Sequence, residues 1–186
     1  MYHYGANNPV RYIDPDGKKD KTGPNLNFFP ECEPISKWCQ KEIRPQDVFV
    51  VAAHGNPNYI CKYPNPVTDE NGNVSRGVGE QISAEQLAEI IKSSPEYKEG
   101  MTVILWSCST GKDMGNGKNN YAQKLANLLG AGVKVCAPTT SIWFYPNKPS
   151  KIAEKKKELY NGKMQEVADD SRPGKMKIFM KEKENE

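Results

Sequence analysis

Three apolar segments in the middle of the chain have the pattern of buried strands. Val48–Ala53 is a continuous run of β-branched and other apolar residues, Met101–Ser107 is a second run, and Val133–Ala137 is a third, shorter one. Apolar runs of this kind are typical of strands that are covered on both faces of a sheet. We therefore expect these three segments to form a central sheet.

Two amphipathic segments connect these strands. Ser83 is followed three residues later by Gln86, which is the spacing of a capping box, and the helix that it begins should end near Ser94. A second helix is predicted over Asn119–Leu129, with Gly130 as its stop. The order strand, helix, strand, helix, strand predicts an α/β fold with a doubly wound, mostly parallel sheet and right-handed crossovers.

The remaining segments are less regular. Tyr59–Gly79 is rich in Pro, Asn, Asp and Gly, and its Asn-Gly pair predicts a loop or a small β-hairpin. Ser141–Tyr145 is expected to be a short strand or an aromatic-rich loop. We predict a charged helix over Ser150–Tyr160 and a late strand over Lys175–Met180, where Met and Ile alternate with other residues.

These patterns divide the chain into four parts. Residues 1–17 are dense in Asn, Pro and Gly and have too few apolar residues to fold alone. Residues 18–46 contain several Pro and Gly breaks, so we expect a linker that packs on the surface of the domain. Residues 47–181 form the predicted α/β domain, and residues 182–186 should fray.

Charge and hydropathy exclude several classes of partner. The 26 basic and 23 acidic residues give a formal net charge of +3 and are interleaved along the chain. Lys155–Lys157 is flanked by glutamates, so we interpret this triplet as a solvated helix face. No nucleic-acid partner is therefore expected. The longest apolar run is Val48–Ala53, far short of the roughly 20 residues that span a bilayer. We expect no membrane insertion, and no signal peptide is recognised in this chain.

The five cysteines do not have the spacing of a zinc site. Their number is odd, no Cys-x-x-Cys pair is present, and the chain has only two histidines. The thiols are therefore expected to be mostly reduced, and we expect neither a metal nor an organic cofactor.

His54 and Cys108 are the residues that carry candidate chemistry. Each follows directly on a predicted strand, and ligands of open α/β sheets gather beyond the carboxyl ends of the strands. An imidazole beside a thiol can take its proton and thereby generate the nucleophilic thiolate. The N–H groups of Gly55 and Cys108 could bind the oxyanion of a tetrahedral intermediate.

The order of these residues and the blocks around them resemble the caspase, gingipain and clostripain clan of cysteine peptidases. An apolar block ends in His54-Gly55, a second ends in Ser107-Cys108, and Gly111 lies three positions after the cysteine. The resemblance covers about residues 47–145. It implies a three-layer, mostly parallel caspase-like sheet with helices on both faces, and a His54–Cys108 dyad.

The resemblance does not extend to the substrate pocket. The caspase pentapeptide Gln-Ala-Cys-x-Gly is not reproduced around Cys108, so no specificity residue can be transferred. From their positions after the strands, the candidates for substrate binding are Asp113, Thr139, Thr140, Ser141 and Trp143. Asp113 could contact a basic side chain of a substrate, although a solvated loop carboxylate is the simpler expectation.

The N-terminal segment resembles a second family. From Tyr2 to Gly17 the chain reproduces Tyr-x-Tyr-x-x-Asn-Asn-Pro, a short strand, and Asp-Pro-x-Gly, which mark the end of the core of RHS/YD-repeat proteins. In that family the core is a shell that encloses a variable C-terminal domain, commonly a toxin. The resemblance implies a secreted effector delivered into the cytoplasm of a target cell, with the upstream RHS core and an immunity protein as partners.

These observations lead to a functional hypothesis with two alternatives. The hypothesis is a cysteine endopeptidase toxin that cleaves a protein substrate of the target cell by a His54–Cys108 dyad. The first alternative keeps the dyad but changes the reaction to another acyl transfer, such as deamidation. The second is a non-catalytic caspase-like module that binds a partner.

Overall fold

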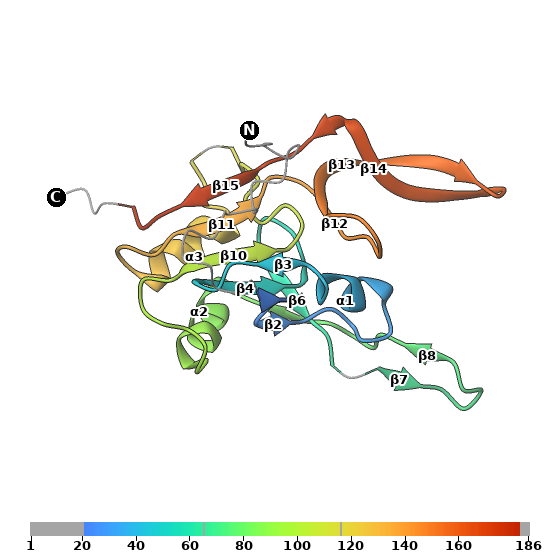
Figure 1. Cartoon of the computed structure of the whole chain (residues 1–186), viewed down its shortest axis with the longest axis horizontal. Coiled ribbons are helices and arrows are strands. Elements are labelled where there is room, and N and C mark those ends of the chain that lie inside the picture. Colours follow the sequence, from blue (N-terminus) through green and yellow to red (C-terminus); the bar gives the residue numbers. More distant parts are fainter. Residues whose placement is uncertain (1–20, 65, 116, 183–186) are drawn as a thin grey trace.

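A five-stranded sheet forms the centre of the molecule (Figure 1). The computed structural model describes residues 21–64, 66–115 and 117–182. In spatial order the strands are β15 (Met176–Phe179), β11 (Val135–Pro138), β10 (Thr102–Trp106), β4 (Val48–Ala52) and β2 (Leu26–Asn27). Neighbouring strands from β11 to β2 are parallel, and β15 runs antiparallel to β11 at the edge. The predicted mixed α/β fold with a mostly parallel sheet is confirmed at this level.

The two predicted helices are confirmed, and so are the capping box at Ser83 and the stop at Gly130. α2 (Ala84–Ser93) begins at Ser83, whose hydroxyl accepts the N–H of Gln86 at 3.3 Å while its own N–H donates to the Gln86 side chain at 2.8 Å. α3 (Tyr121–Leu129) begins at Asn120, whose side chain accepts the Gln123 N–H. These bonds satisfy backbone donors that a helix start leaves without intrahelical partners.

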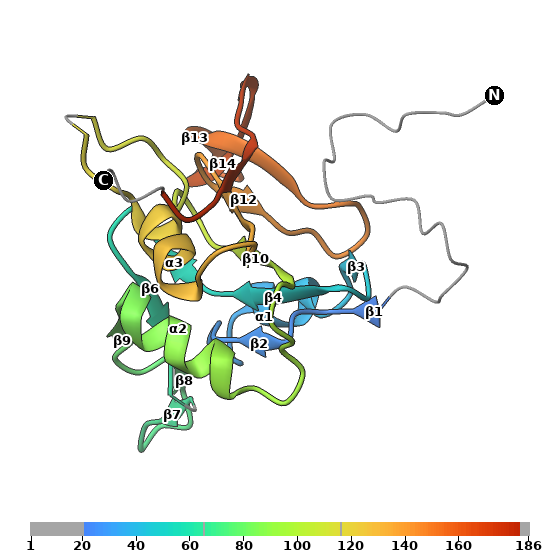
Figure 2. The ribbon, with the colours of Figure 1, turned by 90° about the vertical axis from the view of Figure 1, so that its left-hand side faces the viewer.

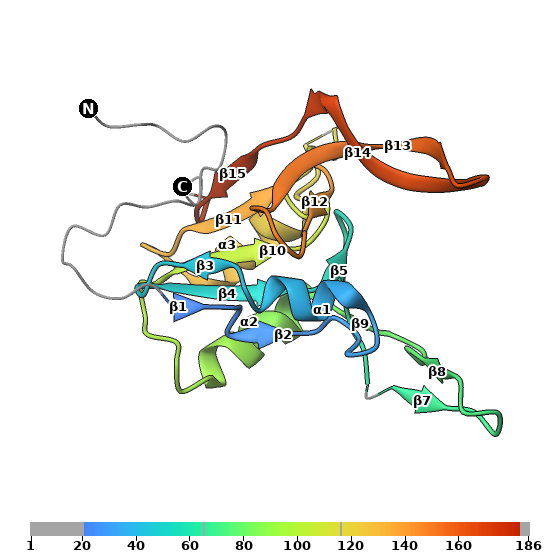
Figure 3. The same cartoon turned by 45° about the vertical axis from the view of Figure 1, so that its right-hand side comes forward.

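Both faces of the sheet are covered. Residues on one side of β4, β10 and β11 pack with α2 and α3, which lie side by side in Figure 2. Residues on the other side pack with α1 (Pro34–Cys39), which Figure 3 brings to the front. The side chains of β4 and β10 that face this second core are Val48, Val50, Ala52, Ile104 and Trp106. Burial on both faces explains why the strands are continuous apolar runs.

The segment 18–46 supplies more than the surface linker that its composition indicated. It contributes β2 to the central sheet, and its short strands β1 (Lys21–Thr22) and β3 (Ile43–Arg44) pair with each other. Phe28, Phe29 and Cys39 are buried. The elements here are two to six residues long, too short to show a period between the Pro and Gly breaks.

The charged helix expected over Ser150–Tyr160 is wrong. This segment is β13 (Lys151–Tyr160), which pairs with β14 (Lys163–Pro173) and with β12 (Ile142–Trp143) in a three-stranded antiparallel sheet. Asn161 and Gly162 form the turn with positive φ values of 49° and 76°, as a two-residue type I′ hairpin turn requires. The Asn161-Gly162 pair is therefore the sequence signal that favours a hairpin over a helix in this segment. The hairpin leaves the body as an arm in Figure 1.

A second hairpin arm confirms the prediction for Tyr59–Gly79. β7 (Val67–Thr68) and β8 (Val74–Ser75) pair around Gly72, whose φ is 79°. At its base, β5 (His54–Gly55), β6 (Ile60–Lys62) and β9 (Glu80–Ile82) form a small antiparallel sheet. Figures 1 and 3 show both arms projecting on the side to which the carboxyl ends of β4 and β10 point.

The C-terminal strand is present, but its buried positions differ from the expected alternation. Phe179 packs into the core beside α3, whereas Ile178 and Met180 are exposed. Glu182 still bonds to α3 through Asn127. The N-terminal motif at 1–17 and the tail from 183 lie outside the described residues. Among the helices of the described ranges, none has the length and apolar character needed to cross a membrane.

Candidate active site

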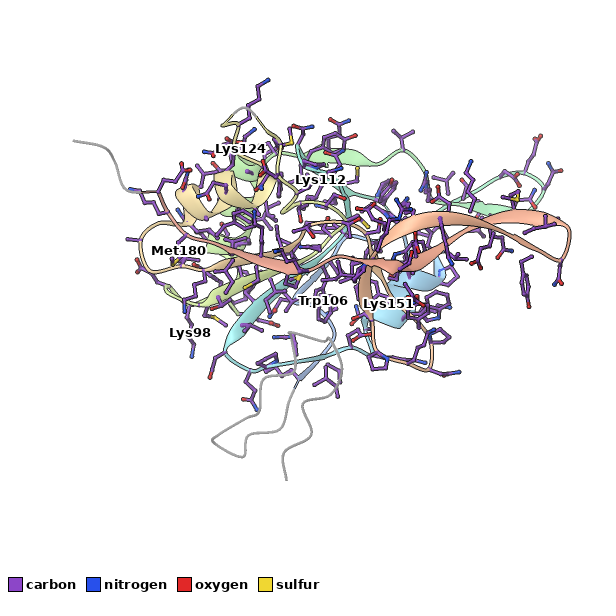
Figure 4. The ribbon with its side chains drawn as sticks, turned by 90° about the horizontal axis from the view of Figure 1, so that it is seen from above. Lys98, Trp106, Lys112, Lys124, Lys151 and Met180 are labelled. Atoms are coloured by element: carbon purple, nitrogen blue, oxygen red, sulfur yellow. The ribbon has the colours of Figure 1, made fainter. Side chains whose placement is uncertain are left out.

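The register of two parallel strands brings His54 and Cys108 to the same place at the edge of the sheet. Ala52 at the end of β4 is paired with Trp106 at the end of β10, and the Ala53 N–H donates to the Trp106 carbonyl at 3.2 Å. His54 and Cys108 each follow two residues after this last pair. Trp106 is labelled in the body of the molecule in Figure 4, seen from above.

Both residues lie beside the second core. Ala52 and Trp106, the last residues of their strands, pack into this core. Cys108 packs against this core, and the His54 ring lies 4.9 Å from that of Phe29, another of its members. The two side chains thus both lie against the second core and are partly exposed. Direct contact between the thiol and the imidazole stays a prediction.

Gly55 packs closely against Ser107, where the two strand ends meet. A Cβ atom on Gly55 would overlap the Ser107 hydroxyl and approach the Thr110 methyl group to 3.3 Å. The missing side chain at Gly55 therefore allows the His54 segment to lie against the turn that holds Cys108. This placement is compatible with the predicted oxyanion role of the Gly55 and Cys108 N–H groups, which stays a prediction.

The turn after Cys108 is fixed by the segment beyond β11. Ser109 has a positive φ of 56°, an uncommon conformation for a residue other than glycine, and its N–H donates to the Thr140 carbonyl at 2.8 Å. The Gly111 N–H donates a hydrogen bond to the Pro138 carbonyl at 3.0 Å. The Cys108 thiol lies 3.9 Å from the Ile142 carbonyl. These contacts hold the thiol at a sharp turn, between the end of β10 and the start of β12.

Glu33 is a site residue that the sequence analysis missed. Its Oε2 lies 2.6 Å from Nε2 of His54, and its Oε1 accepts a hydrogen bond from Arg76 at 3.1 Å. Glu33 is the N-cap residue of α1, where Pro34 begins the helix. It lies 21 residues before His54 in an irregular polar segment, and no sequence pattern links the two. Glu33 and His54 meet only because residues 18–46, which were expected to be a linker, fold onto the domain.

The five candidate substrate residues have different surroundings. Thr140 contacts the Cys108 turn through its carbonyl, and Ser141 is buried beside it. The Thr139 hydroxyl accepts the Lys175 N–H, and the Trp143 indole donates to the Ala153 carbonyl in β13. Asp113 accepts the N–H of Gly115 in its own exposed loop. The structure therefore places the start of the 139–143 segment next to the thiol and gives Asp113 a local role in its loop.

The other cysteines have different environments. All five are free. Burial raises the pKa of the Cys39 thiol to about 12, and burial also raises the pKa of Cys136, which lies in the second core. Both thiols are thus held protonated at neutral pH. Within the described ranges, no group of three or more His, Cys, Asp or Glu side chains is arranged to hold a metal ion.

Comparison with known proteins assigns the chain to a family. The chain belongs to the family described as Domain of unknown function (DUF8616), whose model matches residues 24–165. It is similar to YibJ of Escherichia coli (strain K12), an uncharacterized protein, with 35% identity over 122 residues. That alignment covers 66% of this chain and 42% of YibJ, so the chain spans about two fifths of the relative's length. No solved structure matches the chain.

Proposed function

We propose that this chain is a cysteine endopeptidase in which Cys108 is the nucleophile and His54 is the general base and acid. The observation that carries the proposal is the register of β4 and β10, which places both residues two positions beyond one parallel pair. Their position beside the second core and their partial exposure favour a reaction at the edge of the sheet, where open α/β folds bind ligands. The sharp turn at Ser109 presents the thiol at that edge.

The proposed reaction proceeds in two stages. The Cys108 proton passes to His54, and the thiolate attacks the carbonyl carbon of a peptide bond while backbone N–H groups stabilise the oxyanion. When the C–N bond breaks, His54 gives the proton to the leaving amine and a thioester remains on Cys108. Water then gives a proton to His54 and attacks the thioester, and the sulfur leaves as the thiolate, which His54 reprotonates.

We also propose the finer fold and the biological setting that the resemblances imply. Helices on opposite faces of a mostly parallel sheet, with a His-Gly block and a Ser-Cys block at neighbouring strand ends, support a caspase-like three-layer domain. The RHS-like motif over 1–17 supports a toxin payload released into a target cell, with a protein substrate and a cognate immunity protein as partners.

Alanine variants of the dyad test this function. Cys108→Ala and His54→Ala should each reduce proteolysis by roughly a thousandfold or more, and the double variant should be little worse, because the two residues act as a unit. Cys136→Ala is the matched control, since that thiol is buried in the core, and it should remain active. The measurement is mass spectrometry of a target-cell proteome incubated with each variant, scored for new N-termini.

The same spectra distinguish the alternatives. New N-termini that require both Cys108 and His54 would support the peptidase. A one-dalton increase on glutamine or asparagine without new N-termini would replace peptide cleavage with deamidation on the same dyad. Unchanged proteolysis by Cys108→Ala would contradict the dyad. If wild type produces neither new N-termini nor the one-dalton increase, the binding module is the better account.

A further inference from the structure

The Glu33 carboxylate forms a hydrogen bond with Nε2 of the His54 imidazole. The Glu33 Oε2 to His54 Nε2 distance of 2.6 Å is that of a short, charge-assisted hydrogen bond, and the two side chains are 26% and 32% exposed. Partial burial reduces the solvent screening of this contact relative to a surface ion pair. Because an ionised carboxylate can only accept hydrogen bonds, the ring nitrogen that carries the proton is Nε2.

Three further contacts fix this pair in place. The second oxygen of Glu33 is bonded to Arg76, which follows the β7–β8 arm, and the guanidinium of Arg76 lies 5.3 Å from the centre of the Tyr63 ring. Tyr63 and Phe29 present their rings edge-on to the imidazole at centroid distances of 5.8 and 4.9 Å. The imidazole is thus oriented by one hydrogen bond and two aromatic neighbours.

We propose that Glu33 is a positioning residue for His54, a role that rests on the dyad proposed above. With the Nε2 proton donated to Glu33, Nδ1 is the nitrogen left to take the Cys108 proton. The carboxylate also stabilises the imidazolium that this transfer creates, so it favours the thiolate and imidazolium pair over the neutral pair. The hydrogen bond from Arg76 orients the Glu33 carboxylate toward Nε2 of His54.

The charges around the imidazole support this assignment. The titratable groups around this cluster are Glu33 at the start of α1, Cys61 opposite His54 in β6, Tyr63, Arg76, and Cys32 beside Arg76. Cys108, after β10, packs against the core that contains Phe29. Burial raises the pKa of Cys61 and of Tyr63, so both stay protonated at neutral pH. The charged groups beside the His54 ring are therefore the Glu33 carboxylate and the Arg76 guanidinium. The two charges partly neutralise each other.

The test measures the reactivity of the Cys108 thiol rather than turnover. Wild type, Glu33→Gln, His54→Ala and Glu31→Gln are alkylated with iodoacetamide from pH 5 to 10, and mass spectrometry follows the peptide that contains Cys108. Glu31→Gln is the matched control, because it removes the same charge from an exposed residue two positions away. Imidazole nitrogen shifts in NMR spectra report which ring nitrogen is protonated.

The expected result is a loss of reactivity that depends on pH. Glu33→Gln should slow alkylation of Cys108 at neutral pH by roughly tenfold or more, because the imidazolium that forms on proton transfer loses its carboxylate partner. Its rate should equal that of wild type near pH 10, where a thiol ionises without help. Loosened packing alone would instead change the rate at every pH. Glu31→Gln should match wild type throughout.

Each contrary outcome overturns a different statement. If His54→Ala slows alkylation at neutral pH but Glu33→Gln does not, or if the Nε2 proton is absent in wild type, the role of Glu33 is refuted and the dyad stands. If His54→Ala leaves the alkylation profile unchanged, the coupling between imidazole and thiol is refuted, and the proposed function falls with it.

Discussion

Ser107 has an unusual position for a polar residue. Among the described side chains, its hydroxyl is the buried oxygen or nitrogen without a hydrogen-bond partner, and the residue is 1% exposed. A buried polar group that lacks a partner costs about 1–3 kcal/mol. The hydroxyl faces Gly55, so the strand end that presents Cys108 carries a local energetic cost where it meets the His54 segment.

A double-mutant cycle tests this contact. Ser107→Ala should leave the free energy of unfolding unchanged or raise it by about 1 kcal/mol, because it removes the orphan hydroxyl. Gly55→Ala should lower it by about 1–3 kcal/mol, because the new methyl group overlaps that hydroxyl. In the Ser107→Ala background the same change should cost less, although Ile60 and Thr110 still lie nearby. Chemical denaturation provides the measurement, and strictly additive effects would exclude the contact.

At the scale of elements, long regular patterns predicted the structure and short or ambiguous ones did not. The strands β4 and β10 follow from their sequences because each is a continuous apolar run, and the helices α2 and α3 follow because each is long enough to show a helical period between end signals. The run from Lys151 to Tyr160 has charges that fit either a helix or an exposed strand, and its turn decides the outcome. Here the type I′ geometry of Asn161-Gly162 overrides helix propensity.

The candidate site shows the same division. His54 and Cys108 could be found because each directly follows a strand of recognisable pattern. Glu33 could not, because its contact with His54 depends on a two-residue strand and a six-residue helix that leave no periodic signal. Contacts between distant segments of irregular structure follow from tertiary packing rather than from local pattern.

The capping box of α2 gives a prediction for a single element. Ser83→Ala should lower the free energy of unfolding by about 1 kcal/mol, because the Gln86 N–H loses its acceptor. The start of this helix packs into the core between the sheet and helices α2 and α3. Ser93→Ala, an exposed change at the other end of the same helix, should not destabilise the protein. Thermal or urea unfolding measures both, and equal effects of the two substitutions would contradict the role of the cap.

At the scale of the whole molecule, the site depends on distant parts of one compact core. Glu33, His54 and Cys108 come from three separate segments, and Arg76 joins them from the base of the β7–β8 arm. The two buried cores draw their members from residues between Phe28 and Phe179. The segment expected to be a linker therefore belongs with the domain, in agreement with the family match that begins at residue 24.

This boundary gives the last prediction. Removal of residues 1–17 should leave the far-UV circular dichroism of the remainder unchanged and its Tm within about 2 °C, because the sequence of this segment has too few apolar residues to supply a periodic core face. Removal of residues 1–27 is the contrasting variant. It deletes β2 from the edge of the sheet, together with Asn25, whose N–H donates to the Val50 carbonyl and whose side chain accepts the Val50 N–H. It should lower the Tm by more than about 4 °C. Alkylation of Cys108 should retain its pH profile in the shorter deletion alone, because the second also disturbs the strand that leads to Glu33. Unfolding after removal of residues 1–17 would show that the RHS-like motif is part of the fold, and would refute a payload that begins after Gly17.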